Sequence, residues 1–347
     1  MGIAHGKTPK MSFTIGSNTD PDVILAKKIS EEFGFEHINL EYDTPNEDCL
    51  SDAFAFVARS DFSSNACSYA QLPRIFRKLD SYREHQVCGV GGEIGTGFYY
   101  TPLDGIINNQ ISKDLWIKYR LSVPGNLAGK IFKKTCLSKY SKNSEKNVLN
   151  VIGSIGDLSW RSKVDCLYSE NRMRQWAGPV LKSSSYWYGI HAPFLEENYI
   201  SWGMGLDSED KKDRKAQLEK TKQFCPDLAV VPYGGDLSQN KNESSKNFFH
   251  KLSKVDKIIK RLFGKRREGD LGASDFSSKV FGMKEAQSIV IEFTSSHPTV
   301  LNADVINEMI NNPRLYANEL GFLLTVSLSS LYLDKMTRSF KDAQLEL

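Results

Sequence analysis

A strand, a helix and a second strand follow one another near the start of the sequence, and this succession constrains the fold more than any other feature. Ser12–Gly16 reads as a strand, and a polar turn separates it from Pro21, which suits the first position of a helix. Gly34 suits the left-handed residue that ends a helix, and Phe35–Leu40 reads as the second strand. Two strands joined in this way are parallel, with a right-handed crossover.

The alternation of strands and helices continues beyond this unit. Helical patterns occupy residues 47–60 and 69–83, and a short buried strand occupies residues 86–88. The alternation predicts an α/β protein with a doubly wound parallel sheet. Beyond Lys113 strand patterns nearly vanish, so we expect a mainly helical region to follow. Its predicted helices are 115–140, 158–181, 206–224, 303–311 and 313–336, with a polar loop at 234–248.

Composition excludes several classes of protein. The chain has 347 residues, 40% of them hydrophobic and 25% charged, which is ordinary for a globular protein, and its net charge of +3 is too small to imply a nucleic-acid partner. The six cysteines include no close-spaced pair, so we expect reduced thiols in the cytoplasm. Gly321–Leu333 is the most apolar run, but it is too short to span a bilayer and predicts a buried helix rather than a membrane contact.

Basic residues gather between Lys254 and Arg267, with apolar residues among them at the spacing of one helical face. The simpler interpretation is a solvated helix with an apolar stripe that faces the core. A binding site for phosphate or for a membrane surface is the alternative.

A glycine-rich segment, Gly89–Tyr99, follows the strand predicted at 86–88. Glycines at the carboxyl end of a strand let backbone amides approach an anionic ligand, because no Cβ is in the way. Open α/β sheets also bind their ligands at this edge. Glycines after a strand more often form a simple turn, and the pattern alone favours that interpretation over a binding site.

Three segments, in this order, resemble the C-terminal domain of asparagine synthetase, a member of the ATP-pyrophosphatase superfamily. The first is Phe13–Asp22 with the helix that follows it, and the second is the glycine-rich segment, where Gly91, Gly97 and Tyr99 match the family pattern. The third, Ala-Pro-Phe-Leu-Glu at 192–196, is similar to the family's Val-Pro-Phe-Leu-Asp, and Lys-Ala-Gln-Leu at 215–218 is similar to Lys-x-x-Leu-Arg. The resemblance covers roughly residues 11–235, and the last helices more loosely.

The resemblance implies which residues hold the nucleotide and its metal. Laid on the family pattern, the nucleotide-binding positions are Ile15, Gly16, Cys88, Gly89 and Gly91. Glu93 falls where the family has an Asp that binds magnesium. A longer carboxylate can still bind a hard cation. The alternative is that Glu93 caps the following turn.

The resemblance also implies a domain organisation and a reaction. It implies an α/β nucleotide-binding part over 1–110, a helical part over 111–235 that completes the site, and a loop with C-terminal helices over 236–347. The reaction is activation of a small-molecule carboxylate with ATP and Mg²⁺, followed by displacement of AMP by an amine. Lys215 matches the lysine that contacts pyrophosphate and the acyl group. Without the resemblance, Lys215 is one more charge on a charged helix.

Departures from the family pattern carry information too. Val90 stands where asparagine synthetases have a Glu beside the ammonia, and Glu219 replaces the Arg of Lys-x-x-Leu-Arg. The phosphate loop, Ser-Gly-Gly-x-Asp-Ser, does not occur in the sequence. We therefore expect an N-terminally shortened and divergent relative that lacks the first strand and phosphate loop of its fold. An upstream glutaminase or phosphate-loop segment is the expected partner.

The sequence thus predicts an asparagine-synthase-like, AMP-forming amide ligase whose acceptor differs from aspartate. The alternative is a degenerate nucleotide-fold protein that binds or interacts without catalysis.

Overall fold

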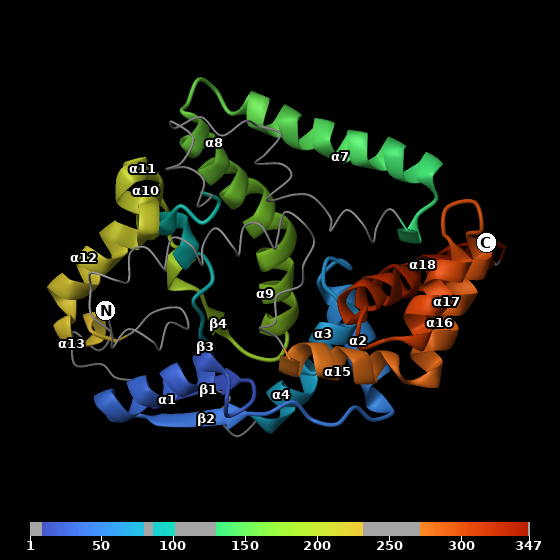
Figure 1. The fold of residues 1–347 in the computed structure, drawn as a ribbon, viewed down its shortest axis with the longest axis horizontal. Helices are drawn as coiled ribbons and strands as arrows, with labels where there is room; N and C mark the ends of the chain where they lie inside the picture. Colours follow the sequence, from blue (N-terminus) through green and yellow to red (C-terminus); the bar gives the residue numbers. More distant parts are fainter. Residues whose placement is uncertain (1–8, 80–85, 101–129, 232–270, 346–347) are drawn as a thin grey trace.

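The computed structural model describes residues 9–79, 86–100, 130–231 and 271–345 (Figure 1). The protein is α/β and mostly helical (68%), with only two small parallel sheets. Within the described residues, no helix is both long and apolar enough to cross a membrane. Residues 115–129 of the helix predicted over 115–140, the loop at 234–248 and the basic segment at 254–267 lie outside the described residues.

The first sheet pairs β1 (Met11–Ile15) with β2 (Glu36–Leu40), and α1 (Pro21–Phe33) connects them. The strands are parallel, with Met11 opposite Glu36 and Ile15 opposite Leu40. Pro21 begins α1, and Gly34 ends it in the left-handed conformation (φ 71°), where its N–H donates to the carbonyl of Ser30. The predicted strand–helix–strand unit is confirmed, and so are the predicted roles of Pro21 at the start of the helix and Gly34 at its end.

The second sheet pairs β3 (Gln86–Val87) with β4 (Ile190–His191), also in parallel. The sequence pattern predicted β3, but β4 lies in a region that was expected to be mainly helical. Among the described residues the two pairs remain separate sheets, so a continuous doubly wound sheet is not seen.

A small apolar cluster holds the first sheet next to β4. Its buried members come from α4 (Leu72–Lys78) and its end, and from Tyr188 just before β4. The Tyr188 hydroxyl donates to the carbonyl of Phe76 on α4. The partly buried side chains packed against the cluster are Met11, Phe13, Ile15, Leu40, Leu72 and Trp187. Helix α4 therefore links the end of β1 to the strand that lies beside the glycine-rich segment.

The main core lies between helices from the two ends of the chain (Figure 1). These helices are α2 (Asp48–Arg59), α3 (Ala66–Tyr69), α15 (Leu271–Phe281), α16 (Lys284–Ser296), α17 (Ala303–Asn311) and α18 (Ala317–Leu345). The hydroxyl of Thr325 accepts from the N–H of Ala66 at 2.8 Å, and Asn65 Nδ2 donates to the Asn318 carbonyl at 3.0 Å. The C-terminal helices thus share one core with α2 and α3. The pattern predicted α17 correctly but missed α15 and α16.

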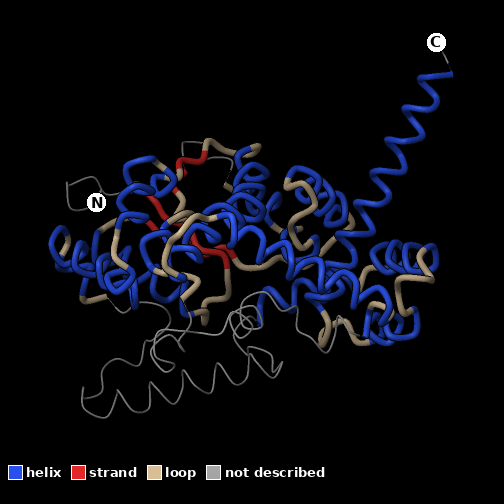
Figure 2. Tube along the Cα trace, turned by 90° about the horizontal axis from the view of Figure 1, so that it is seen from above, coloured by secondary structure: helices blue, strands red, loops and turns tan. Residues whose placement is uncertain are grey.

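The middle of the chain is helical, as predicted, but it is divided differently. Its elements are α7 (Lys134–Ser154), α8 (Trp160–Leu167), the π-helical segment η5 (Tyr168–Ala177), α9 (Gly178–Ser185), α10 (Glu197–Gly205), α11 (Ser208–Lys211), η7 (Lys212–Arg214), α12 (Lys215–Phe224) and α13 (Pro226–Ala229). The single helix predicted over 206–224 is wrong, because Arg214 adopts a left-handed conformation (φ 64°) and separates α11 from α12. Seen from above, α18 extends away from the body of the protein (Figure 2).

Candidate functional site

The glycine-rich segment forms a tight turn directly after β3. Gly91 and Gly97 have positive φ angles of 93° and 57°, and the 3₁₀ helix η3 (Gly92–Thr96) lies between them. A Cβ at Gly91 would lie 2.6 Å from Leu195 Cδ2 and 2.9 Å from the Phe194 carbonyl oxygen. Gly91 is therefore required both by its backbone conformation and by close packing against η6 (Pro193–Leu195).

Helices α10 and α12 hold the same turn through one carbonyl group. Gln217 Nε2 donates to the Gly92 carbonyl at 2.8 Å, and the Tyr199 hydroxyl donates to it at 2.8 Å. Gln217 also donates to the Tyr199 oxygen at 3.0 Å. The segments at 88–99, 192–196 and 215–218 therefore meet, although they lie far apart in the sequence.

Glu93 lies on η3 beside two partners that the sequence did not identify. The Tyr168 hydroxyl donates to Glu93 Oε2 at 3.1 Å. Burial, followed by the charge of Glu93, raises the pKa of Tyr168, so its phenol remains a donor at neutral pH. Arg214 is half-buried near the Glu93 carboxylate, and burial lowers its pKa more than the attraction of Glu93 raises it. The carboxylate thus accepts a hydrogen bond from a phenol, and a guanidinium lies within range of its charge.

Glu93 would supply only one of the ligands that a magnesium site needs. Within the part of the chain that the structure describes, no group of three or more His, Cys, Asp or Glu side chains is arranged to hold a metal ion. Magnesium is commonly bound through one or two carboxylates, substrate phosphates and water. Glu93 fits a site of that kind, and its role as a metal ligand stays a prediction.

Lys215 begins α12, and Gln217, in the same first turn of this helix, contacts η3. Its own amine pairs with Asp210 Oδ1 at 3.1 Å, and 58% of the side chain is exposed. The hydrogen bond that Lys215 donates to Asp210, and the charge of Asp210, raise the pKa of Lys215, so the side chain is cationic. The structure thus brings the helix of Lys215 to the glycine turn and directs the amine to Asp210.

The remaining predicted positions lie at the ends of strands. Ile15 packs against the small apolar cluster that α4 forms with Tyr188. A Cβ at Gly16 would lie 2.4 Å from Asp20 Oδ2, which accepts the N–H of Ser17 at 2.7 Å. The N–H of Cys88 donates to the His191 carbonyl at 2.9 Å, whereas a Cβ at Gly89 would meet no atom within 4 Å. Gly16 is thus required by a local turn, and packing does not require Gly89.

A buried ion pair next to the glycine-rich segment was not predicted from the sequence. Lys211 Nζ lies 2.7 Å from Asp165 Oδ2, and the Tyr100 hydroxyl donates to the same oxygen at 2.8 Å. Burial raises the pKa of Asp165, while the bonds from Lys211 and Tyr100 oppose this shift. The pair ties α8 and α11 to the residue that follows the glycine-rich segment. Nothing in the charged run around Lys211 distinguishes this lysine from its neighbours.

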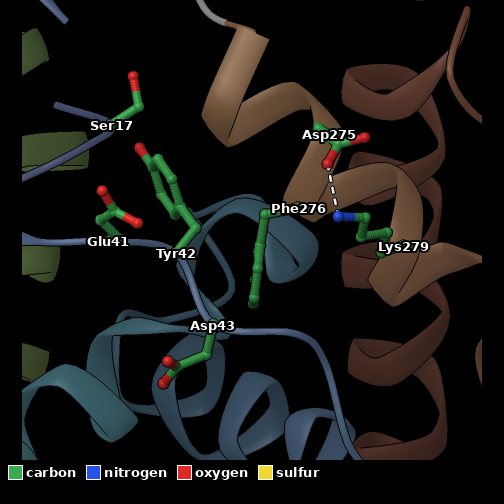
Figure 3. A pocket seen from close by; sticks show the side chains of 7 residues that line it. All are labelled: Ser17, Glu41, Tyr42, Asp43, Asp275, Phe276 and Lys279. Carbon is green, nitrogen blue, oxygen red and sulfur yellow. Dashed lines mark ion pairs between the residues drawn. The ribbon is translucent and has the colours of Figure 1, made fainter. Parts of the chain in front are cut away.

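A small polar pocket of about 140 Å³ lies where β1 and β2 end, against α15 (Figure 3). Its lining residues are Ser17, Glu41, Tyr42, Asp43, Asp275, Phe276 and Lys279. Each carboxylate already has a donor: Asn18 bonds Glu41, Lys78 bonds Asp43, and Lys279 bonds Asp275. The pocket lies at the ligand-binding edge of a parallel sheet. The glycine turn is the stronger candidate because more of the singled-out residues meet there.

Comparison with protein-family models, curated proteins and solved structures finds no match for this chain. The candidate site therefore rests on the residues and contacts described above.

Proposed function

We propose that this chain is an asparagine-synthase-like, ATP-dependent amide ligase that forms AMP. One observation carries the proposal: the glycine turn contacts both Phe194–Leu195 and Gln217. Those contacts join two of the three segments in which the sequence resembles the family, the glycine-rich segment and both parts of the third segment, 192–196 and 215–218. A chain that merely resembled the family by chance would have no reason to bring these segments together.

The proposed reaction assigns a task to each part of the site. The open space beside Gly89 lets main-chain N–H groups approach phosphate oxygens. Glu93 would hold Mg²⁺, which supplies charge neutralisation on the phosphates when it is bound. Lys215 would exchange Asp210 for the departing pyrophosphate, and its flexible, exposed stem allows this movement. Val90 cannot accept a proton, so we propose an acceptor other than aspartate.

The two strand pairs also bear on the fold that we propose. The β1–β2 and β3–β4 pairs are both parallel, and the cluster around α4 lies between them. We propose that they belong to one doubly wound sheet that lacks the first strand and phosphate loop of the family. A two-stranded sheet is marginal alone, which favours one continuous sheet.

ATP–pyrophosphate exchange tests the proposal. The folded chain, with Mg²⁺ and a panel of small carboxylates, should transfer labelled pyrophosphate into ATP. The Lys215→Ala variant should lose most of this exchange, and Lys222→Ala, which alters an exposed residue on the same helix, should keep it. Equal exchange by Lys215→Ala would remove that residue from the mechanism.

A nucleotide-fold protein that binds without catalysis is a second candidate. The existing pairs of Lys215 with Asp210 and of Glu93 with Tyr168 favour it, because both predicted site residues already have protein partners. ATP binding by the folded chain, without exchange under any substrate condition, would support this second function over the first.

A further inference from the structure

The guanidinium of Arg172 lies over two aromatic rings. Its central carbon is 4.9 Å from the ring centroid of Phe98 and 4.4 Å from that of Trp176. Within the part of the chain that the structure describes, the guanidinium has no hydrogen bond and no ion pair. Stacking on rings positions an arginine without using its five N–H donors. Arg172 is therefore held in place with its donors available.

The two rings come from different parts of the chain. Trp176 lies on η5, four residues after Arg172, whereas Phe98 belongs to the glycine-rich segment. Phe98 also contacts Tyr168, with the ring centroids 5.3 Å apart, and the Tyr168 hydroxyl donates to Glu93 Oε2 at 3.1 Å. These direct contacts place Arg172 beside the candidate site.

The segment that carries Arg172 has an uncommon backbone. The η5 segment is π-helical from Tyr168 to Ala177. π-Helical turns are rare, and they are frequent at functional sites. Tyr168 and Arg172 both contact Phe98, and Arg172 also contacts Trp176. The side chains of Tyr168, Arg172 and Trp176 therefore share one face of η5, toward the glycine-rich segment.

A guanidinium with available donors beside an apolar surface suits a carboxylic acid. The planar fork of arginine binds a carboxylate through two parallel hydrogen bonds. Trp176 is 40% exposed, so its indole offers apolar surface for the body of the ligand. The Glu93 carboxylate, bonded to the neighbouring Tyr168, would repel a multiply charged phosphate more strongly than a single carboxylate.

We propose that Arg172, Phe98 and Trp176 bind a small carboxylic acid with an aromatic or apolar body. Arg172 holds the carboxylate, and the exposed indole packs against the body of the acid. That this acid is the one activated by the ligase rests on the proposed function. The binding itself requires only the guanidinium and the two rings.

Calorimetric titration of the full chain with benzoate and phenylacetate tests this site, with acetate and inorganic phosphate as comparison ligands. We expect one of the two aromatic acids to bind at least about tenfold more tightly than either comparison ligand. Arg172→Gln should weaken this binding at least about tenfold, because it removes the charged fork. Arg174→Gln makes the same change of charge at an exposed position of η5, and it should bind within about twofold of the unaltered chain.

Four results would overturn the site. They are no binding of either aromatic acid by the unaltered chain, unchanged binding by Arg172→Gln, an equal loss in Arg174→Gln, and phosphate binding as tight as that of the acids. Should Arg172→Gln fail to fold, Arg172→Lys keeps a cation but lacks the planar fork. It must then show a clear loss of acid binding, and unchanged binding would overturn the site.

Failure of the proposed ligase looks different from failure of this site. An aromatic acid bound through Arg172, with no ATP–pyrophosphate exchange, leaves the acid site standing without the ligase. Exchange that depends on a carboxylate, with the same KM for that acid in Arg172→Gln as in the unaltered chain, leaves the ligase standing without this site. A raised KM in Arg172→Gln would support both, since the lost contact is one that binds the acid.

Discussion

Lys211 and Asp165 form an ion pair, 2.7 Å from Nζ to Oδ2, in which only 3% and 6% of the two side chains are exposed. Removing one partner of such a pair leaves a buried charge without compensation. We expect Lys211→Met to lower the free energy of unfolding by about 3–5 kcal/mol, measured by chemical denaturation. The double variant Lys211→Met/Asp165→Leu removes both charges and should recover much of the loss. A double variant less stable than Lys211→Met would contradict this account.

Gly91 and Gly89 provide a matched pair in the glycine turn. Gly91→Ala adds a Cβ that would overlap Leu195 and the Phe194 carbonyl, at a residue with φ of 93°. We expect it to cost about 1–3 kcal/mol of unfolding free energy, as overpacking and backbone strain commonly do. Gly89→Ala meets open space and should change stability by less than about 0.5 kcal/mol, as most surface substitutions do. Equal effects at the two glycines would show that the contact with η6 does not fix the turn.

The Tyr168 phenol should titrate above its ordinary value of 10.0, because burial and the charge of Glu93 both raise its pKa. A raised pKa means that the unfolded phenol ionises first. The stability that this group contributes is therefore fully present below pH 10 and is lost as pH rises toward the folded value.

Ultraviolet titration of the tyrosines checks this prediction. Tyr168→Phe should remove one late-ionising phenol, and Glu93→Gln should move that ionisation to lower pH because the neighbouring negative charge is gone. An unchanged titration in Glu93→Gln would place the origin of the shift in burial alone.

Helix α18 allows a direct test of the core that joins the two ends of the chain. Leu324 is fully buried, whereas Phe322, on the same helix, is 55% exposed. Leu324→Ala should cost about 2–5 kcal/mol, because it leaves a cavity between α18 and its neighbours. Phe322→Ala should cost much less in the same denaturation experiment. The reverse order would mean that the outward face of α18 is covered in solution.

The sequence predicts features that depend on neighbouring residues. Pro21 and Gly34 mark the ends of α1 by their own backbone preferences, and the alternation around them requires β1 and β2 to be parallel. Helix 303–311 was likewise predicted from its own apolar spacing, and the structure has it with the same bounds.

Features that depend on contacts between residues far apart in the sequence could not be predicted in this way. Lys211 is one lysine in a charged run until the fold places Asp165 beside it. The break at Arg214 gives no local signal, since arginine has no preference for a left-handed backbone. Gly91 and Gly89 are indistinguishable in sequence, and only the approach of Leu195 separates them. Helices α15 and α16 were missed because their apolar residues follow the helical period less clearly than those of α17.

ATP–pyrophosphate exchange by the folded chain, in the presence of Mg²⁺ and candidate carboxylates, tests the central claim most directly. The account predicts exchange that requires both metal and carboxylate and that falls at least tenfold in Lys215→Ala but not in Lys222→Ala. A folded chain that neither binds ATP nor exchanges pyrophosphate would contradict it.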